Sequence, residues 1–216
     1  MRTRHYATIV SVMGVPRMPQ ARKPGGPKDA GRPRDPALDR AVLTAAADLL
    51  SEQGYRALTM DAVAGRAGTS KTAIYRRWPG KTALIIDVLA ERLPPPTPPN
   101  TGGPPGDLVE AGRRFAEALA DPAVRHGMTG LLAEAAVDAS ITVQIRERLV
   151  RPQIAAAEVV VADAHAAGII PTWMTADLIA DVFTGTILQR VLIRGETPDR
   201  EFFESIARLL TTAAGH

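Results

Sequence analysis

The residues best suited to specific chemistry lie in a short stretch between positions 59 and 81. Hydroxyl, ammonium and guanidinium groups donate hydrogen bonds to phosphate oxygens and to the edges of bases. A cluster of such donors on one helical surface therefore predicts contact with a nucleic-acid backbone and with bases in its groove. The side chains concerned are those of Thr59, Ser70, Lys71, Thr72, Tyr75, Arg76 and Lys81.

Short helices with clear ends position these side chains. Thr59 and Ser70 are both favourable N-cap residues, because a side-chain oxygen accepts a hydrogen bond from an unpaired amide of the first turn. Gly68 separates the two helices that they begin, the Pro79-Gly80 pair ends the second, and Lys81 opens another. The inward face of the helix after Ser70 is expected to consist of Ala73, Ile74 and Trp78.

A longer helix precedes this pair. Asp35 is a suitable N-cap, Pro36 suits the first helical position, and Gly54 is a C-terminal stop. Two short helices joined by a tight turn and packed on a longer one form a helix-turn-helix, whose second helix enters the major groove of DNA. Spacing alone leaves an alternative open, because any small helical bundle with capped helices has the same pattern. The apolar face of the first helix would comprise Leu38, Val42, Ala45, Ala46 and Leu49.

The fuller string of residues across these helices favours the first interpretation. It closely resembles the N-terminal domain of the TetR family (tetracycline-repressor-like regulators) over roughly residues 37–85. Trp78 stands where the family usually has Phe or Trp, and Thr69 stands where Val is common. The matching residues are Gly54-Tyr55, Thr59-Met60, Ala67-Gly68-Thr69-Ser70-Lys71, Ile74-Tyr75, Trp78-Pro79-Gly80-Lys81 and Leu84.

The resemblance implies double-stranded DNA as a partner and assigns roles by position. Tyr55 and Trp78 match core positions of the family. A basic segment before the first helix reaches the minor groove in several members, which makes Arg32 and Arg34 candidates here. Residues that match the family's phosphate and base contacts are Thr59, Ser70, Lys71, Thr72, Tyr75, Arg76 and Lys81.

Charge is distributed unevenly along the chain. Residues 1–34 carry eight basic residues and one acidic residue, whereas residues 94–216 carry ten basic and fifteen acidic residues. A cationic segment attracts polyanions by releasing their counterions, so the N-terminal part is expected to face nucleic acid. The alternative for residues 1–30 is a solvated, disordered tail, since residues 16–36 are rich in Pro, Gly, Lys and Arg.

The pattern beyond the N-terminal part is helical, so the predicted fold class is all-α. Residues 1–34 are expected to be a flexible basic arm and residues 35–93 the helix-turn-helix DNA-binding domain. Residues 94–106 hold ten Pro or Gly residues and are expected to form a loop. Residues 107–216 would form a larger helical domain for effector binding and dimerisation. Its helices are expected at about 107–120, 122–136, 139–167, 175–193 and 199–213.

Two apolar stripes near the C-terminus predict a homodimer. The segment 188–198 and the residues Phe202, Phe203 and Ile206 resemble a recurrent C-terminal variant of the TetR family, in which such stripes build a four-helix interface across a two-fold axis. The alternative is an intramolecular core. The stripes consist of Leu178, Val182, Phe183, Ile187, Phe202, Ile206, Leu209 and Leu210.

The family resemblance also implies a small-molecule effector of unknown identity. Ligand pockets combine apolar walls with a few polar groups. Phe115, Met128 and Trp173 are candidates for the wall, with His126, Gln144 and Gln189 as polar candidates, although each is as consistent with core or surface. A filled core would instead indicate a regulator without an effector.

Other classes of function find little support. The four histidines lack metal-ligand spacing, no phosphate-binding Gly-rich loop precedes a helix, and cysteine is absent, so no catalysis, cofactor or metal is expected. No apolar run approaches the roughly 18 residues of a membrane span, and a cytoplasmic location is expected. The sequence therefore predicts a DNA-binding regulator, interpreted as a repressor that an effector releases from a palindromic operator. The alternative is an effector-blind or non-specific, architectural DNA-binding protein.

Overall fold

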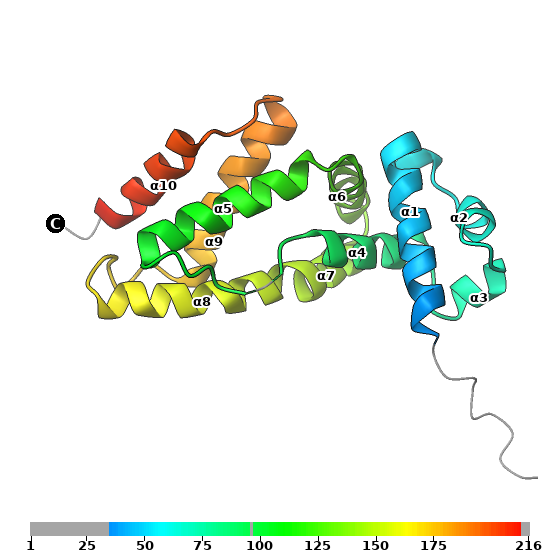
Figure 1. Cartoon of the computed structure of the whole chain (residues 1–216), viewed down its shortest axis with the longest axis horizontal. Helices are drawn as coiled ribbons and strands as arrows, with labels where there is room; N and C mark the ends of the chain where they lie inside the picture. The colour runs from blue at the N-terminus through cyan, green and yellow to red at the C-terminus, as the bar shows by residue number, and fades with distance from the viewer. Residues whose placement is uncertain (1–34, 96, 213–216) are drawn as a thin grey trace, which may run out of the picture. The chain divides into compact units, whose positions relative to one another are not determined.

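Every regular element in the residues described by the computed structural model, 35–95 and 97–212, is a helix (Figure 1). The expected basic arm, with Arg32 and Arg34, lies outside these residues. No helix among those described is both long and apolar enough to cross a membrane. The N-terminal helices are α1 (Pro36–Ala57), α2 (Met60–Arg66), α3 (Lys71–Tyr75) and α4 (Lys81–Arg92).

Side-chain caps begin the first three helices at the predicted residues. The Asp35 carboxylate accepts from the amide of Ala37 at 3.0 Å. The hydroxyl of Thr59 accepts from Ala62 N and that of Ser70 accepts from Ala73 N, both at 3.2 Å. Each cap satisfies an amide that has no partner within its helix, so the predicted starts are confirmed.

Gly54 interrupts the first helix as predicted. Its φ of +75° lies in the left-handed region, which a residue without Cβ adopts at little cost. The chain then continues for three more residues to Ala57, and Tyr55 turns into the core, where 8% of its surface is exposed.

The remaining helices follow the predicted order. They are α5 (Pro104–Ala120), α6 (Pro122–Ala135), α7 (Ala139–Ile145), η1 (Arg146–Val150), α8 (Arg151–Ala166), α9 (Ala176–Leu188), η2 (Gln189–Ile193) and α10 (Arg200–Thr212). Here η1 and η2 are wide, π-helical turns within longer helical runs, so the predicted helix over 139–167 is one run whose hydrogen bonding widens in the middle.

Helix α5 begins within the segment that was expected to be a loop. Pro104 and Pro105 occupy its first turn, where a missing amide costs nothing because the first amides of a helix have no partner within it. Asp107 in the same turn accepts from the amide of Thr101 at 2.7 Å and closes the loop onto the helix.

Buried apolar side chains form one cluster that extends from α1 to α10. Helix α1 packs against α2 on one side and against α4 and α6 on another. Helices α4 and α6 approach closely at Gly127, where a Cβ atom would lie 3.1 Å from Leu89 Cδ2. The helix-turn-helix and the C-terminal helices therefore share a core and are not independent bodies.

Candidate nucleic-acid interface and ligand cavity

Helix α3 divides into an inward and an outward side. Ala73 and Ile74 are 8% and 1% exposed, and Trp78, just beyond the helix, is 5% exposed. The predicted inward residues are therefore confirmed. The side chains that remain at the surface are those of Ser70, Lys71, Thr72, Tyr75 and Arg76.

Lys71 is held at the start of α3 by an acidic neighbour. Its ammonium lies 2.9 Å from Asp61 Oδ2, in the first turn of α2, and 6.0 Å from the centre of the Tyr75 ring. The hydrogen bond from the ammonium to Asp61 raises the pKa of Lys71. Both side chains are exposed, and such ion pairs are weak in water, so the ammonium can exchange Asp61 for a phosphate or for a base edge.

Lys81, also predicted to contact DNA, is half buried and bonded inside the chain. Its ammonium donates to the backbone oxygen of Tyr55 at 3.1 Å and lies 4.3 Å from the centre of the Tyr55 ring. Thr59 is exposed, and its hydroxyl already caps α2. Both side chains hold the helix-turn-helix together, whatever they contact outside it.

Two links fix the end of α3 to its neighbours. Arg77 forms an ion pair with Asp39 in the first turn of α1. The indole Nε1 of Trp78 donates to Asp87 Oδ2 of α4 at 2.8 Å. The other oxygen of Asp87 pairs with Arg148 of η1, so a chain of contacts joins the end of α3 to the C-terminal helices.

Sequence reasoning did not find this chain of contacts. The spacing of Trp78 and Asp87 carries no helical signal, because a helix break lies between them. A buried indole N–H needs an acceptor, and that need is the signal that could have led to Asp87.

A second junction joins α1 and α4 to α6. His126 Nδ1 donates to the backbone oxygen of Leu50 at 2.8 Å, and Thr82 donates to Glu134 Oε2 at 2.7 Å. The Tyr55 ring lies against Gly130 of α6, and burial raises the pKa of Tyr55 to about 12. His126, named as a polar candidate for the effector site, thus binds the backbone of the DNA-binding part.

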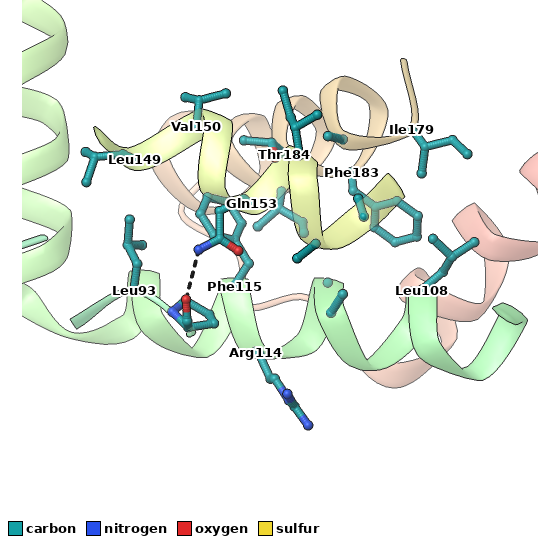
Figure 2. A pocket seen from close by; sticks show the side chains of 18 of the residues that line it. Leu93, Leu108, Arg114, Phe115, Leu149, Val150, Gln153, Ile179, Phe183 and Thr184 are labelled. Carbon is teal, nitrogen blue, oxygen red and sulfur yellow. Dashed lines mark hydrogen bonds between the residues drawn. The ribbon is translucent and has the colours of Figure 1, made fainter. Parts of the chain in front are cut away.

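A cavity of about 320 Å³ lies among the C-terminal helices (Figure 2). Phe115 and Met128 line it as predicted candidates, but Trp173 does not, because it is 63% exposed after α8. Gln144 and Gln189 are not in the wall either. The wall is mostly hydrocarbon and includes Leu93, Leu108, Leu149, Ile154, Val160, Ile179, Phe183 and Ile187.

Prolines after α4 form part of the same wall. They lie in the segment that the sequence predicted to be a loop. Pro94, Pro95, Pro98 and Pro99 border the cavity. Gln153 of α8 donates from its amide nitrogen to the backbone oxygen of Pro94 at 2.9 Å, drawn dashed in Figure 2.

The residues of the predicted dimer stripes separate into two groups. Phe183, Ile187, Ile206 and Leu210 are buried within one chain, where they belong to the core. The stripes reach the surface through Leu178, which is 39% exposed, Leu209, which is 67% exposed, and the partly buried Val182 and Phe202.

Comparison with protein families shows to which family the chain belongs. A family profile described as "Tetracyclin repressor-like, C-terminal domain" matches residues 98–210, more than half of the chain, and "Bacterial regulatory proteins, tetR family" matches residues 42–88. The chain belongs to the TetR family. It is a DNA-binding transcriptional regulator of the TetR type, in a family of transcription factors and not of enzymes. The predicted family and the all-α fold are confirmed.

Individual relatives agree with this assignment. The "Uncharacterized HTH-type transcriptional regulator YdeS" of Bacillus subtilis is 32% identical over 172 residues, which cover 77% of this chain and 84% of YdeS. The crystal structure of the TetR family regulator SCO0332 is 28% identical, with a TM-score of 0.66 over 82% of this chain and 97% of that one. The FadR regulator of Bacillus subtilis in complex with stearoyl-CoA shares the fold, at 15% identity, a TM-score of 0.62, and 81% and 98% coverage.

Proposed function

We propose that this TetR-family chain is a cytoplasmic repressor that binds a palindromic operator as a homodimer and leaves it when a small molecule fills the cavity. The observation that carries the DNA-binding part is the outward side of α3. Thr72, Tyr75 and Arg76 are exposed there, beside Lys71, whose ammonium pairs with an exposed carboxylate. These groups suit base edges and phosphates in a major groove.

Dimerisation is supported by the surface of the last two long helices. Leu178 and Val182 lie one turn apart on α9, and Phe202 and Leu209 of α10 are also accessible. An apolar surface of this kind is stabilised by burial against a second copy. A two-fold dimer presents two copies of α3 to half-sites about 34–36 Å apart, one turn of DNA.

Effector control is supported by the cavity and by the shared core. A volume of about 320 Å³ lies within the range of small-molecule sites, roughly 300–1,000 Å³. Helix α6 borders the cavity with Met128 and packs on α4 at Gly127, so a ligand that displaces α6 also acts on the DNA-binding part. The fold of FadR, which holds stearoyl-CoA, is consistent with a ligand in this domain.

The test is a selection of operators from random duplex DNA with the full chain, followed by binding measurements on three variants. Lys71→Ala and Thr72→Ala should change the preferred bases, whereas Tyr75→Ala should weaken binding to all sequences. Ala162→Phe, on the exposed side of α8, is the control and should bind as the wild type does.

Two outcomes would overturn the proposal. Selection without any enriched palindrome, together with a steep salt dependence, would indicate a non-specific, architectural DNA-binding protein. Equal affinity and equal base preference for wild type and all three α3 variants would remove α3 from the interface.

A further inference from the structure

The charged side chains that border the cavity are already engaged elsewhere or face solvent. Asp107 accepts from the amide and the hydroxyl of Thr101, at 2.7 and 2.8 Å. Asp181 is exposed on α9. Arg114 points away from the other lining side chains in Figure 2 and donates to Glu110 at 2.7 Å.

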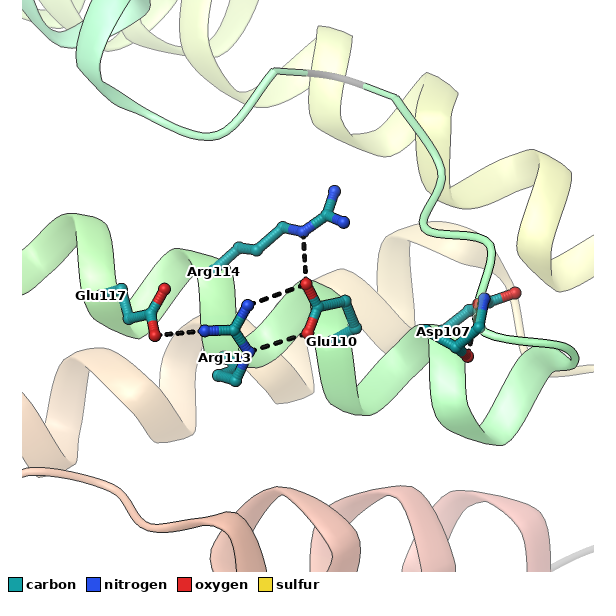
Figure 3. Close-up of polar contacts among 6 residues, drawn as sticks. Asp107, Glu110, Arg113, Arg114 and Glu117 are labelled. Carbon is teal, nitrogen blue, oxygen red and sulfur yellow. Dashed lines mark hydrogen bonds and ion pairs between the residues drawn. The ribbon is translucent and has the colours of Figure 1, made fainter.

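The Arg114 guanidinium belongs to a network of ion pairs along α5. Glu110 also accepts two hydrogen bonds from Arg113, at 2.8 and 2.9 Å, and Arg113 pairs in turn with Glu117 (Figure 3). The two guanidinium groups lower the pKa of Glu110 to about 2, so this carboxylate stays charged and keeps Arg114 engaged. A negatively charged ligand would have to compete with Glu110 for the Arg114 guanidinium.

The rest of the described wall offers no counterion to a charged ligand. Beyond Asp107, Arg114 and Asp181, the described wall contains no ionisable side chain. A buried charge without a partner is strongly disfavoured in a hydrocarbon environment. The wall therefore disfavours ionised groups of either sign.

Three uncharged polar side chains line the cavity, those of Thr97, Gln153 and Thr184, and among the described hydrogen bonds only the Gln153 side chain is fixed by one. The amide nitrogen of Gln153 is used by Pro94 O, at 2.9 Å, while none of the hydrogen bonds among the described residues ends on its amide oxygen. In Figure 2 this oxygen lies on the side of the amide away from the Pro94 contact. An amide oxygen accepts hydrogen bonds from N–H or O–H groups.

We propose that the cavity selects an uncharged, mainly apolar molecule with an N–H or O–H group that donates a hydrogen bond to the amide oxygen of Gln153. This inference rests on the proposed function only for its biological meaning, since the binding itself is measured without DNA. The effector class is then neutral lipid-like or aromatic compounds, and not acids, phosphate esters or amines.

A pair of probes with one skeleton tests the charge selection. N-phenyl-1-naphthylamine is neutral, and 8-anilino-1-naphthalenesulfonate carries the same rings with a sulfonate. We expect calorimetric titration of the full chain to give one site per chain and at least tenfold tighter binding of the neutral probe. Equal or tighter binding of the sulfonate at that site would overturn the proposal.

Two variants of α8 show whether the probe occupies the cavity. Ala157 lines the cavity, and Ala162 of the same helix is exposed. Ala157→Phe should weaken binding of the neutral probe at least tenfold, because the new ring fills the cavity. Ala162→Phe should leave the affinity of this probe unchanged. Unchanged affinity in Ala157→Phe, with a helical content equal to the wild type, would place the probe elsewhere and refute the inference.

Gln153→Leu tests the hydrogen bond. In 1-benzylnaphthalene a methylene group replaces the N–H of N-phenyl-1-naphthylamine, so only the amine can use the Gln153 oxygen. The variant should weaken binding of the amine about tenfold more than binding of the hydrocarbon, and this difference corresponds to roughly 1.4 kcal/mol. An equal effect on both probes would refute the role of Gln153.

The same samples separate this inference from the proposed function. If the chain binds a selected operator but shows no preference for the neutral probe, the ligand class is refuted and the DNA-binding function stands. If the neutral probe binds as expected and no operator is found by selection, the ligand class stands and the proposed function is refuted.

Discussion

The contact between Tyr55 and Gly130 predicts an unusually costly alanine substitution. A Cβ atom on Gly130 would lie 2.1 Å from Cγ and 2.4 Å from Cδ2 of Tyr55, whereas carbon atoms in contact prefer about 3.5–4.0 Å. The tyrosine cannot move away easily, because its ring is buried and its backbone oxygen is bonded to Lys81. Gly130→Ala must therefore displace α6 from α1.

The size of the effect follows from two opposing terms. Overpacking of a well-packed site costs about 1–3 kcal/mol, and this overlap belongs at the upper end. Replacing a helical glycine by alanine gains about 1 kcal/mol. We expect Gly130→Ala to lower the free energy of unfolding by about 2 kcal/mol.

Urea denaturation at a fixed protein concentration, followed by circular dichroism, measures this difference. Gly65→Ala is the matched control, because nothing lies within 4 Å of a Cβ at this exposed position of α2. It should gain up to about 1 kcal/mol. A Gly130→Ala variant as stable as Gly65→Ala would refute the reasoning.

A double-mutant cycle identifies the partner. In a Tyr55→Ala background the ring is absent, so Gly130→Ala should be neutral or stabilising. The same loss of about 2 kcal/mol in both backgrounds would mean that the cost does not come from Tyr55.

Three other substitutions should change stability, the pH dependence of Tm and the oligomeric mass. Arg148→Gln should lower stability by at most about 1 kcal/mol in the same urea assay, because its ion pair with Asp87 is partly exposed; a loss above about 3 kcal/mol would contradict this. Glu110→Gln should remove an acid-dependent part of the Tm profile. The depressed pKa of Glu110 stabilises the fold above its ordinary pKa of 4.5, and this contribution is lost as the pH falls towards about 2, so parallel profiles would be the contrary result. Leu178→Asp should shift the proposed dimer towards monomer in sedimentation, whereas Val137→Asp, an equally drastic change at an exposed position just beyond α6, should not; identical masses would argue against the dimer surface.

The boundaries of the helices could be predicted because their signals are local. Asp35, Thr59 and Ser70 satisfy amides within three residues of themselves. The inward side of α3 could also be predicted, since helical periodicity alone distinguishes Ile74 from Tyr75. The start of α5 was missed because a run of prolines ends a helix and also begins one.

The cavity and the junctions could not be predicted in the same way. Gln153 and Pro94 are 59 residues apart, and Tyr55 and Gly130 are 75 apart, so no periodicity connects them. Amphipathic stripes show that a side chain is buried but not which helix it faces. For the same reason the exposed Trp173 was assigned to the wall and the prolines after α4 were not.

Under the proposed function, interaction energies indicate which contacts could carry the influence of the cavity to α3. Leu149 lines the cavity, and the preceding Arg148 pairs with Asp87, which also holds Trp78. This pair is 49% and 24% exposed, and such pairs contribute at most about 1 kcal/mol. Allosteric coupling between two sites is typically about 1–3 kcal/mol, so the ion pair alone covers at most the lower end of that range. The larger share must come from apolar packing, where the close approach of α4 and α6 at Gly127 leaves no space for independent movement.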